Sequence, residues 1–485
     1  MVNSEDASSG GRLSEPARIA PLDPGELLRR IEALERRNGE LEATIVALRA
    51  ELERVKRRQH RQAAPFSRET PAPNPKRAGR KPGQGTFAYR TAPAVEDLSE
   101  PPIPVPVTEL TCPHCGGVLV EDGMEVASIT DIPAQPRPIV RQYQVAVCHC
   151  QSCGRRVRGR HPDLATDQYG ATAHRLGPRV LATSHALHYG QGVPQRKVPA
   201  VLEALTGARV TQGALTQDAL RRTDGAVGQA YRGLRASLAQ AERVHTDDTG
   251  WRVGGRPAQL MAFTTETTTV YQIRERHRNE EVREVIPADY AGTLCTDRGK
   301  SYDAHQLQAV KQQKCLCHLQ RSVSDLLEAK WGRGRSFGLG LRRTFREALA
   351  LWHGQRAGTA TNFPTEAARL QARLTDLLWE RPMPDPSNQH LLEDLRWRHA
   401  HGDLLRFLDD PRIEPTNNRA ERALRPAVIA RKVSQCSKNQ PGAEAFAAFA
   451  SVTRTSIQRG HSPINALVAV FQGAPLPPPP PPENR

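Results

Sequence analysis

Two adjacent carboxylates interrupt the string VHTDDTGWRV (residues 244–253), which otherwise has the composition of a buried strand. An acid that faces a protein core destabilises the fold by several kcal/mol unless it is paired, protonated or bound to a cation. Successive side chains of a strand point to opposite faces, so Asp247 and Asp248 cannot easily share one partner. We therefore expect at most one of them to belong to a functional site.

A second acid, Asp297, ends the string GTLCTD (residues 292–297), which also has the pattern of a buried strand. Two more strand patterns, QLMAFTT and TTVYQIR, and a short helix pattern, RHRNEEVREVI, separate it from Asp247. If the first and fourth strands are neighbours in the sheet, the carboxylates of Asp247 and Asp297 converge, although 50 positions separate them in the sequence.

A third acid comes from the string EPTNNRAERALRP, which predicts a helix with one polar and one apolar face. The polar face carries Asn418, Glu421, Arg422 and Arg425. As an alternative, Asn418 and Glu421 have the spacing of an N-cap and its capping-box partner. That alternative explains neither Asn417 nor the two arginines. Pro426 is expected to kink or end the helix.

Four cysteines form two CxxC turns, each followed by glycine, in CPHCGG and CHCQSCGRR: Cys112, Cys115, Cys150 and Cys153. In zinc knuckles the turn amides approach the thiolate sulfurs, and four thiolates complete a tetrahedral structural site. A reducing compartment disfavours disulfides. We therefore predict structural Zn²⁺, with ASITDIP and RQYQVAVC as strands between the turns. Cys148 and His149 are possible substitutes for Cys150.

The chain is strongly basic, with 68 Lys and Arg against 52 Asp and Glu, a net charge of +16. Such an excess predicts a polyanionic partner, most often nucleic acid, whereas a basic but unspecific surface is the alternative. The first twenty residues lack the apolar core of a signal peptide, and no apolar run approaches the roughly 18 residues that span a bilayer. We expect a cytoplasmic protein with no membrane association.

Residues 54–90 hold eleven basic residues and one acidic residue among frequent Pro and Gly. The string KRAGRKPGQG within them is expected to be a flexible arm that follows DNA phosphates. Its predicted DNA contacts are Lys76, Arg77, Arg80 and Lys81. A solvated linker is the alternative.

A heptad pattern precedes this arm and predicts a parallel coiled-coil dimer, with leucine at position d and one polar residue at position a. The residues expected to form the dimer seam are Leu34, Asn38, Leu41, Ile45 and Leu48. An amphipathic helix that packs on its own chain is the alternative.

These patterns predict a multidomain chain of mixed α+β and α/β class. A helix-turn-helix for DNA binding fits PQRKVPAVLEAL and TQGALTQDALRRT, although any two packed helices would look the same. The predicted segments are 1–24, disordered; 25–58, coiled coil; 59–105, basic linker; 106–160, zinc module; 161–240, helical region; 241–318, first part of a sheet core; 319–408, inserted helices; 409–473, second part of the core with the Glu421 helix; and 474–485, proline-rich tail.

Three strands, a helix, a fourth strand and a later acidic helix follow one another in the order of an RNase H-like fold. The strings HTDDTGWRV, TDRGKSY, CLCHLQRSV, PTNNRAERALRPAVIARK and GAEAFAAFASVTRT resemble transposases of the insertion-sequence-66 family, which are of the DDE type. The resemblance covers most of the chain, including the coiled coil, the basic arm and the four cysteines.

The resemblance implies that Asp247, Asp297 and Glu421 are the catalytic acids and share Mg²⁺ (or Mn²⁺), hard cations that prefer oxygen ligands. Asp248 would then be structural. The family also places His318 near the active site, as a phosphate or leaving-group contact or, alternatively, as a structural histidine. The remaining DNA contacts that it implies are Arg321, Arg422, Arg425, Arg431 and Lys432.

The implied enzyme cuts the ends of its element, releases 3′-hydroxyls and joins them to target DNA. Its partners would be double-stranded DNA, a second copy of the chain in a dimer or higher oligomer, and companion proteins of the same element, at the bacterial nucleoid. The sequence departs from the family pattern at DDT, usually DET, and at Arg298, which comes before Gly299. A catalytically silent DNA-binding derivative, an RNase H-like nuclease or resolvase, and a coiled-coil adaptor are the alternatives.

Overall fold

The computed structural model describes residues 24–59, 93–108, 111–120, 123–130, 132, 137–330, 332–379 and 386–479. It divides into two units, Met1–Thr130 and Asp131–Arg485. The predicted disordered N-terminus and the basic arm with Lys76, Arg77, Arg80 and Lys81 lie outside the described residues, as does the end of the proline-rich tail.

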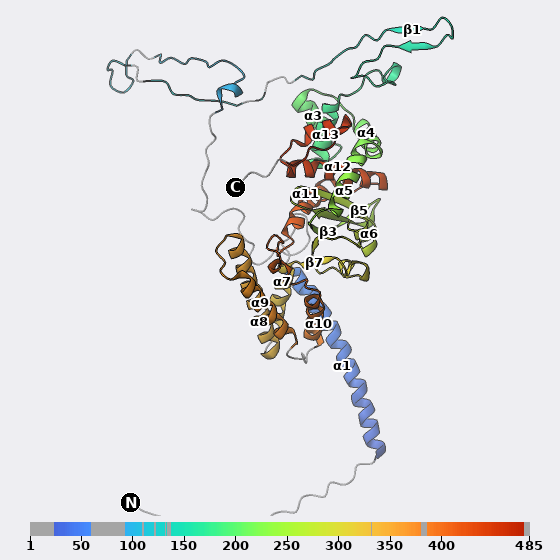
Figure 1. Cartoon of the computed structure of the whole chain (residues 1–485), viewed down its shortest axis with the longest axis vertical. Coiled ribbons are helices and arrows are strands. Elements are labelled where there is room, and N and C mark those ends of the chain that lie inside the picture. Colours follow the sequence, from blue (N-terminus) through green and yellow to red (C-terminus); the bar gives the residue numbers. More distant parts are fainter. Residues whose placement is uncertain are drawn as a thin grey trace, which may run out of the picture. The chain divides into compact units, whose positions relative to one another are not determined.

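The first unit contains a single long helix, α1 (Pro24–Gln59), in the segment predicted to form the coiled coil (Figure 1). Apolar side chains of the predicted seam are between 46% and 67% exposed: Leu34, Leu41, Ile45 and Leu48. The helix is therefore present and the described residues of the first unit do not cover its seam, whereas pairing with a second copy stays a prediction. The short 3₁₀ helix η1 (Val95–Asp97) and an isolated bridge between Thr111 and Val118 follow.

The second unit begins with a two-stranded hairpin, β1 (Val147–His149) and β2 (Arg156–Arg158), which encloses the second CxxC turn. The prediction of strands at ASITDIP and along RQYQVAVC was largely wrong. The described residues of ASITDIP hold no strand, and only the last two residues of RQYQVAVC belong to β1.

A helical region follows, as predicted, and packs around a small cluster of Leu181, Val198 and Leu215. Thr211 caps the helix that contains Leu215, because its hydroxyl accepts the amide of Ala214. Leu205, at the end of the first predicted helix-turn-helix string, is 54% exposed. The elements are η2 (Gly170–Thr172), α2 (Pro178–His185), the π-helical turn η3 (Ala186–Gly190), α3 (Val198–Thr206), α4 (Gln212–Asp224) and α5 (Ala226–Ala239).

A five-stranded mixed sheet forms the core, in the order β5-β4-β3-β6-β7. Its strands are β3 (Arg243–Val253), β4 (Arg256–Thr264), β5 (Thr269–Arg274), β6 (Thr293–Thr296) and β7 (Lys311–Lys314). The strands β3, β4 and β5 form an antiparallel meander, and β6 and β7 run parallel to β3. The predicted meander is confirmed, and the first and fourth strands are neighbours, which was the condition for Asp247 and Asp297 to converge. The fifth strand was not predicted, because its string, KQQK, is entirely polar.

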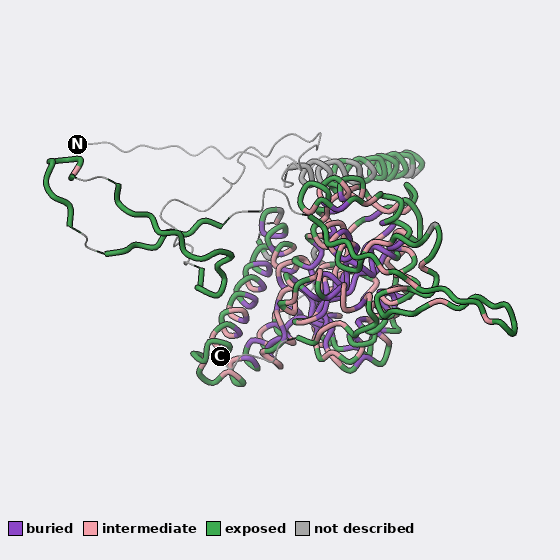
Figure 2. The backbone as a smooth tube through the Cα atoms, turned by 90° about the horizontal axis from the view of Figure 1, so that it is seen from above, coloured by how far each residue is buried: buried purple, intermediate pink, exposed green. Residues whose placement is uncertain are grey.

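Opposite faces of the sheet pack against different helices. Figure 2 shows that buried segments gather in the interior of the second unit. On one face Val244, Met261 and Phe263 pack against α5 and the segment with α6 (Asn279–Arg283), η4 (Lys300–Tyr302) and η5 (His305–Leu307). On the other face Trp251 and Leu260 pack against α11 (Asn418–Ser434). Because neighbouring residues of β3 face opposite ways, this division fixes the direction of each aspartate.

The outer edge of β5 is covered by α12 (Gln440–Gln458), which α13 (Pro463–Phe471) follows. Two hydroxyls one helical turn apart, on Ser451 and Thr455, accept the amides of Tyr271 and Thr269 at 2.8 and 3.0 Å. Thr455 also donates to the carbonyl of Thr269. Side chains of the helix thus supply the hydrogen bonds that a further strand would make.

The predicted helical insertion is present and has its own apolar core, which Leu341, Phe345 and Leu374 help to form. It comprises α7 (Leu316–Ala329), α8 (Gly332–Arg356), α9 (Phe363–Trp379), α10 (Pro386–Ala400) and η6 (Arg406–Leu408). The helices α8, α9 and α10 lie together beyond the β7 side of the sheet (Figure 1). The first of the helices starts directly after β7, so the insertion is joined to the edge strand.

Candidate active site

Three elements bring the predicted acids into one region: β3 carries Asp247, the end of β6 leads to Asp297, and the first turn of α11 carries Glu421. Burial raises the pKa of Asp247 to about 6, and the negative charges of Asp297, Asp248 and Glu421 add to the rise. The negative charges of the other two predicted acids therefore both act on Asp247.

The two adjacent aspartates have different surroundings. Asp247 pairs in register with Ala262, whose side chain belongs to the cluster beneath α11. Asp248 pairs with Met261 on the opposite face, and its carboxylate lies 3.0 Å from Nδ1 of His277. Asp248 thus has an ion-pair partner of its own, whereas Asp247 accepts only the amide of Asp248 among the hydrogen bonds of the described residues.

Asp297 is held by the tight turn that follows it. Its Oδ1 accepts the amide of Gly299 at 2.8 Å. A Cβ at position 299 would lie 2.9 Å from that oxygen and 3.3 Å from the ring of Tyr302, so a side chain there would displace the Asp297 carboxylate. Arg298 is directed elsewhere: its guanidinium donates to Asp394, at 3.3 Å, and to the hydroxyl of Ser322. Arg298, at which the sequence departs from the family pattern, therefore contacts the helical insertion.

Asn417 fixes the helix that carries Glu421. Its side-chain amide donates to the carbonyl of Thr246 at 2.7 Å, and its backbone amide donates to Sγ of Cys315 at 3.2 Å. Asn417, rather than Asn418, is the N-cap of α11, and its side chain makes no capping hydrogen bond. The capping-box alternative is therefore wrong. The helix also does not end at Pro426, since it continues to Ser434.

His318 lies in the first turn of α7, close to Asp297. A hydrogen bond with Cys315 raises the pKa of His318, and the charge of Asp297 contributes. Burial opposes ionisation of Cys315, but hydrogen bonds from His318 and Asn417 lower the pKa of its thiol below the ordinary value. The Nδ1 atom of His318 is buried without a hydrogen-bond partner among the described residues.

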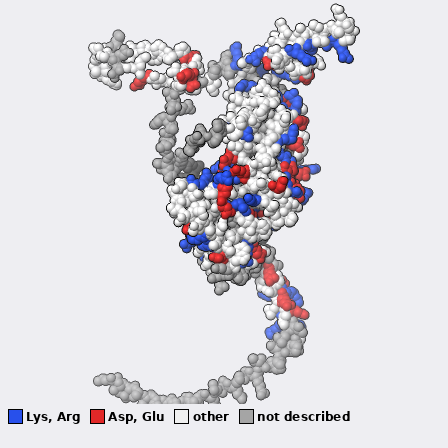
Figure 3. Space-filling view, viewed as in Figure 1, with Lys and Arg blue, Asp and Glu red and all other residues white. Residues whose placement is uncertain are grey.

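The predicted basic contacts on α11 are mostly exposed. Arg422, Arg425 and Lys432 lie on the solvent side of the helix. Arg431 instead donates to the carbonyl of Gly250 in β3. Arg321 is exposed on α7 and acts electrostatically on His318. Figure 3 shows acidic and basic side chains next to each other over the region of α11 and β3, a pattern that suits a cation and a phosphate backbone.

The acids have the chemistry that a hard divalent cation requires. As the side chains stand, no three His, Cys, Asp or Glu residues of the described ranges are close enough together to hold a metal ion. The donor set nevertheless fits Mg²⁺ or Mn²⁺, because carboxylate oxygens are their usual ligands. Burial, and after it repulsion from neighbouring acids, raises the pKa of Asp247, and a bound cation would oppose both effects.

The two CxxC turns share one backbone geometry although they belong to different units. In each, the amide of the glycine after the second cysteine donates to the carbonyl of the first, Gly116 to Cys112 and Gly154 to Cys150, both at 2.8 Å. Both glycines have positive φ, +73° and +67°. Amides of the turns lower the pKa of the Cys112 and Cys150 thiols, which favours thiolates.

The sequence analysis missed two buried basic residues, Lys314 and Arg398, beside the loop of residues 297–303 that follows Asp297. No sequence motif surrounds either residue. The capping interpretation did leave Asn417 unexplained, and that was the available indication of its role.

Comparison with known proteins agrees with this arrangement. A family model described as Transposase IS66 family matches residues 174–445, more than half of the chain. No curated protein matches the chain. In the part of the chain that the structure describes, no helix is both long and apolar enough to cross a membrane. The matched residues run from the helical region through the sheet and the insertion to α12, and the chain belongs to the IS66 family of transposases.

Proposed function

We propose that this transposase binds the ends of its insertion sequence, cuts them to release 3′-hydroxyls, and joins those ends to target DNA by metal-dependent phosphoryl transfer. The observation that carries the proposal is the placement of three acids by β3, the end of β6 and the first turn of α11, close enough for the charges of Asp297 and Glu421 to act on Asp247. Simple binding to DNA does not require such a cluster of acids.

In this proposal Asp247, Asp297 and Glu421 hold Mg²⁺ (or Mn²⁺), which when bound neutralises charge at the scissile phosphate and activates the attacking oxygen. The chain itself positions the acids: strand pairing orients Asp247, the Gly299 amide orients Asp297, and Asn417 ties the Glu421 helix to β3.

Basic side chains contact the DNA strands in the same proposal. A raised pKa keeps His318 protonated to higher pH, which suits contact with a phosphate oxygen. Arg321, Arg422, Arg425 and Lys432 are exposed and free to reach further phosphates, and Arg431 borders them.

The N-terminal part would recognise and pair the ends. The matching turn geometry favours Cys112, Cys115, Cys150 and Cys153 as ligands of one structural Zn²⁺, with Cys150 rather than Cys148 or His149. The α1 seam would hold two copies together, as joining two ends requires, and companion proteins of the same element would assist at the bacterial nucleoid. The basic arm would follow phosphates.

Strand transfer tests the proposal. Pre-cut DNA carrying the element's own ends is mixed with a plasmid and Mg²⁺, with wild-type protein, Asp297→Asn, Glu421→Gln and, as a matched control, Asp248→Asn. We expect joined product from the wild type and the control, and a loss of at least about 1,000-fold in the other two variants with end binding unchanged.

The other outcomes separate the alternatives. Cutting without joining would favour a nuclease or resolvase. Equal end binding with neither cutting nor joining in any protein, with companion proteins added, would favour the silent DNA-binding derivative. Activity that survives in Asp297→Asn and Glu421→Gln would mean that other carboxylates are catalytic.

A further inference from the structure

The loop that follows Asp297 rests on a buried ionic network. Lys314, the last residue of β7, has no exposed side-chain surface. Its Nζ donates to Asp303 at 2.7 Å, to Gln312 at 2.7 Å and to Thr296 at 3.2 Å. An ammonium group is buried at such a depth only when hydrogen bonds and an opposite charge compensate for lost water. The network therefore anchors the far end of the loop, Asp303, to the sheet.

A second buried cation holds the same loop from the helical insertion. Arg398 of α10 donates to both carboxylate oxygens of Asp303, at 2.9 and 2.8 Å. Its Nε donates to Asp394 at 3.0 Å, and one terminal nitrogen lies 3.5 Å from the carbonyl of Arg298. A bidentate guanidinium–carboxylate pair fixes orientation as well as distance. One side chain thus contacts the loop at both of its ends.

Arg298 completes the connection from the loop side. Its guanidinium reaches Asp394 of α10, at 3.3 Å, and the hydroxyl of Ser322 in α7. Asp394 therefore accepts from two arginines, one on the loop and one on its own helix. The pairs link the residue next to Asp297 directly to two helices of the insertion.

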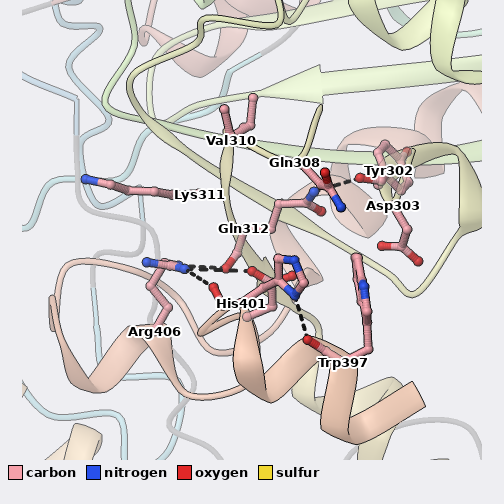
Figure 4. A pocket seen from close by; sticks show the side chains of 11 residues that line it. Tyr302, Asp303, Gln308, Val310, Lys311, Gln312, Trp397, His401 and Arg406 are labelled. Carbon is pink, nitrogen blue, oxygen red and sulfur yellow. Dashed lines mark hydrogen bonds and ion pairs between the residues drawn. The ribbon is translucent and has the colours of Figure 1, made fainter. Parts of the chain in front are cut away.

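A cavity of about 190 Å³ adjoins the carboxylate of Asp303, and Figure 4 shows this side chain near those of Tyr302 and Trp397. Tyr302 packs in the core and holds the backbone at this end of the loop. The Asp303 carboxylate has the cavity on one side, and its ionic contacts with Lys314 and Arg398 orient it.

We propose that Arg298 and Arg398, joined through Asp394 and Asp303, form a clamp by which the helical insertion positions Asp297 for cation binding. The inference rests on the proposed function and deepens it. Both arginines are positioning residues, since neither touches the reacting atoms. A displacement of about 1 Å at a catalytic group can lower a rate about 100-fold, so a clamp on this loop has a large effect.

The alternative is that the network only stabilises the insertion. Buried ion pairs are often no more stabilising than apolar residues of the same size, and the insertion already has its own apolar core. The contacts lie on the Asp297 loop rather than in that core. A control elsewhere in the insertion separates the two roles: Arg373 of α9 pairs with Glu347 of α8 at 2.8 Å and does not contact the loop.

The test measures Mn²⁺ binding by electron paramagnetic resonance and amide hydrogen exchange of residues 297–303, on full-length protein without DNA. For Arg298→Gln and Arg398→Met we expect an approximately tenfold rise in the Mn²⁺ dissociation constant and faster exchange in the loop. Arg298→Lys should recover part of the affinity. Arg373→Met should lower the melting temperature to a similar extent but leave Mn²⁺ affinity and loop exchange unchanged.

Two results would overturn the clamp: wild-type Mn²⁺ affinity in both clamp variants, or an equal loss of affinity in Arg373→Met. Failure of the proposed function looks different, because wild type would then bind no Mn²⁺, or Asp297→Asn would bind it as tightly as wild type does. The measurements need no DNA, so a missing companion protein cannot mask either result.

Discussion

Asp247→Asn is expected to stabilise the metal-free protein. Burial and the neighbouring acids raise the pKa of Asp247 from 3.8 to about 6. A carboxyl group whose pKa is raised on folding binds its proton more tightly in the folded state, so ionisation opposes folding. The destabilisation is absent below about pH 4, grows between about pH 4 and about pH 6, and is fully present above that range. An asparagine at this position carries no charge, so it avoids the destabilisation that ionisation of Asp247 causes.

The size of the effect follows from the two pKa values. The difference between 3.8 and about 6 corresponds to about 3 kcal/mol, at about 1.36 kcal/mol for each pH unit. Asparagine keeps only a weaker version of the hydrogen bond from the Asp248 amide. We therefore expect a net gain of about 1–3 kcal/mol near pH 8, or a rise of about 2–6 °C in melting temperature for a unit of this size.

Thermal melting with EDTA or with Mg²⁺ measures this gain. Near pH 8 with EDTA the variant should melt above wild type, and near pH 5 the difference should be about half as large. Mg²⁺ should raise the melting temperature of wild type more than that of the variant.

Asp248→Asn is the control for this experiment. It removes the contact between the Asp248 carboxylate and Nδ1 of His277, so it is not expected to raise the melting temperature as Asp247→Asn does. If Asp247→Asn instead melted below wild type near pH 8 with EDTA, Asp247 would not be held among repelling charges, and the reasoning that links it to a cation would fail.

Three further predictions concern other parts of the chain. Gly228→Ala in α5 should destabilise by at least about 2 kcal/mol in urea unfolding, because its Cβ would lie 1.9 Å from a backbone oxygen of α4. Gly233→Ala in the same helix meets no atom within 4 Å and should stabilise by up to about 1 kcal/mol. Metal analysis should find one Zn²⁺ per chain, lost in Cys153→Ser and kept in Cys148→Ser. Leu41→Asp, which puts a charge in the α1 seam, should weaken dimerisation about 100-fold by sedimentation.

The fold was predictable where its elements have a clear period. The meander, its helix and β6 have apolar patterns that bury against helices, and the insertion has the amphipathic period of helices. The edge strand β7 escaped prediction because Gln312, Gln313 and Lys314 are buried as polar residues, with partners outside the strand at 10, 91 and 11 positions away. The prediction of strands at ASITDIP and along RQYQVAVC was wrong for the opposite reason. These segments alternate apolar and polar residues as strands do, but alternation alone does not provide a partner strand.

The sequence named the three acids but not the contacts that support them. The order of strands, the helix around Glu421 and the family resemblance led to Asp247, Asp297 and Glu421, whose catalytic role stays a prediction. What Arg298 contacts could not be predicted, because Asp394 lies 96 positions further along the chain. Long-range contacts of this kind depend on the packed arrangement of the insertion, and no local pattern encodes them.

The hydroxyls of α12 also restrict how copies of this protein can assemble. A strand from another chain would have to displace Ser451 and Thr455 from β5 before it could pair there. At the opposite edge, the amide of Lys314 donates to the carbonyl of Asp403, and the Gln312 carbonyl accepts from Arg406. Sheet extension, a common route to aggregation and to fused dimers, is thus obstructed on both sides. In the assembly proposed above, the five-stranded sheet of each copy would therefore stay separate from that of its neighbour.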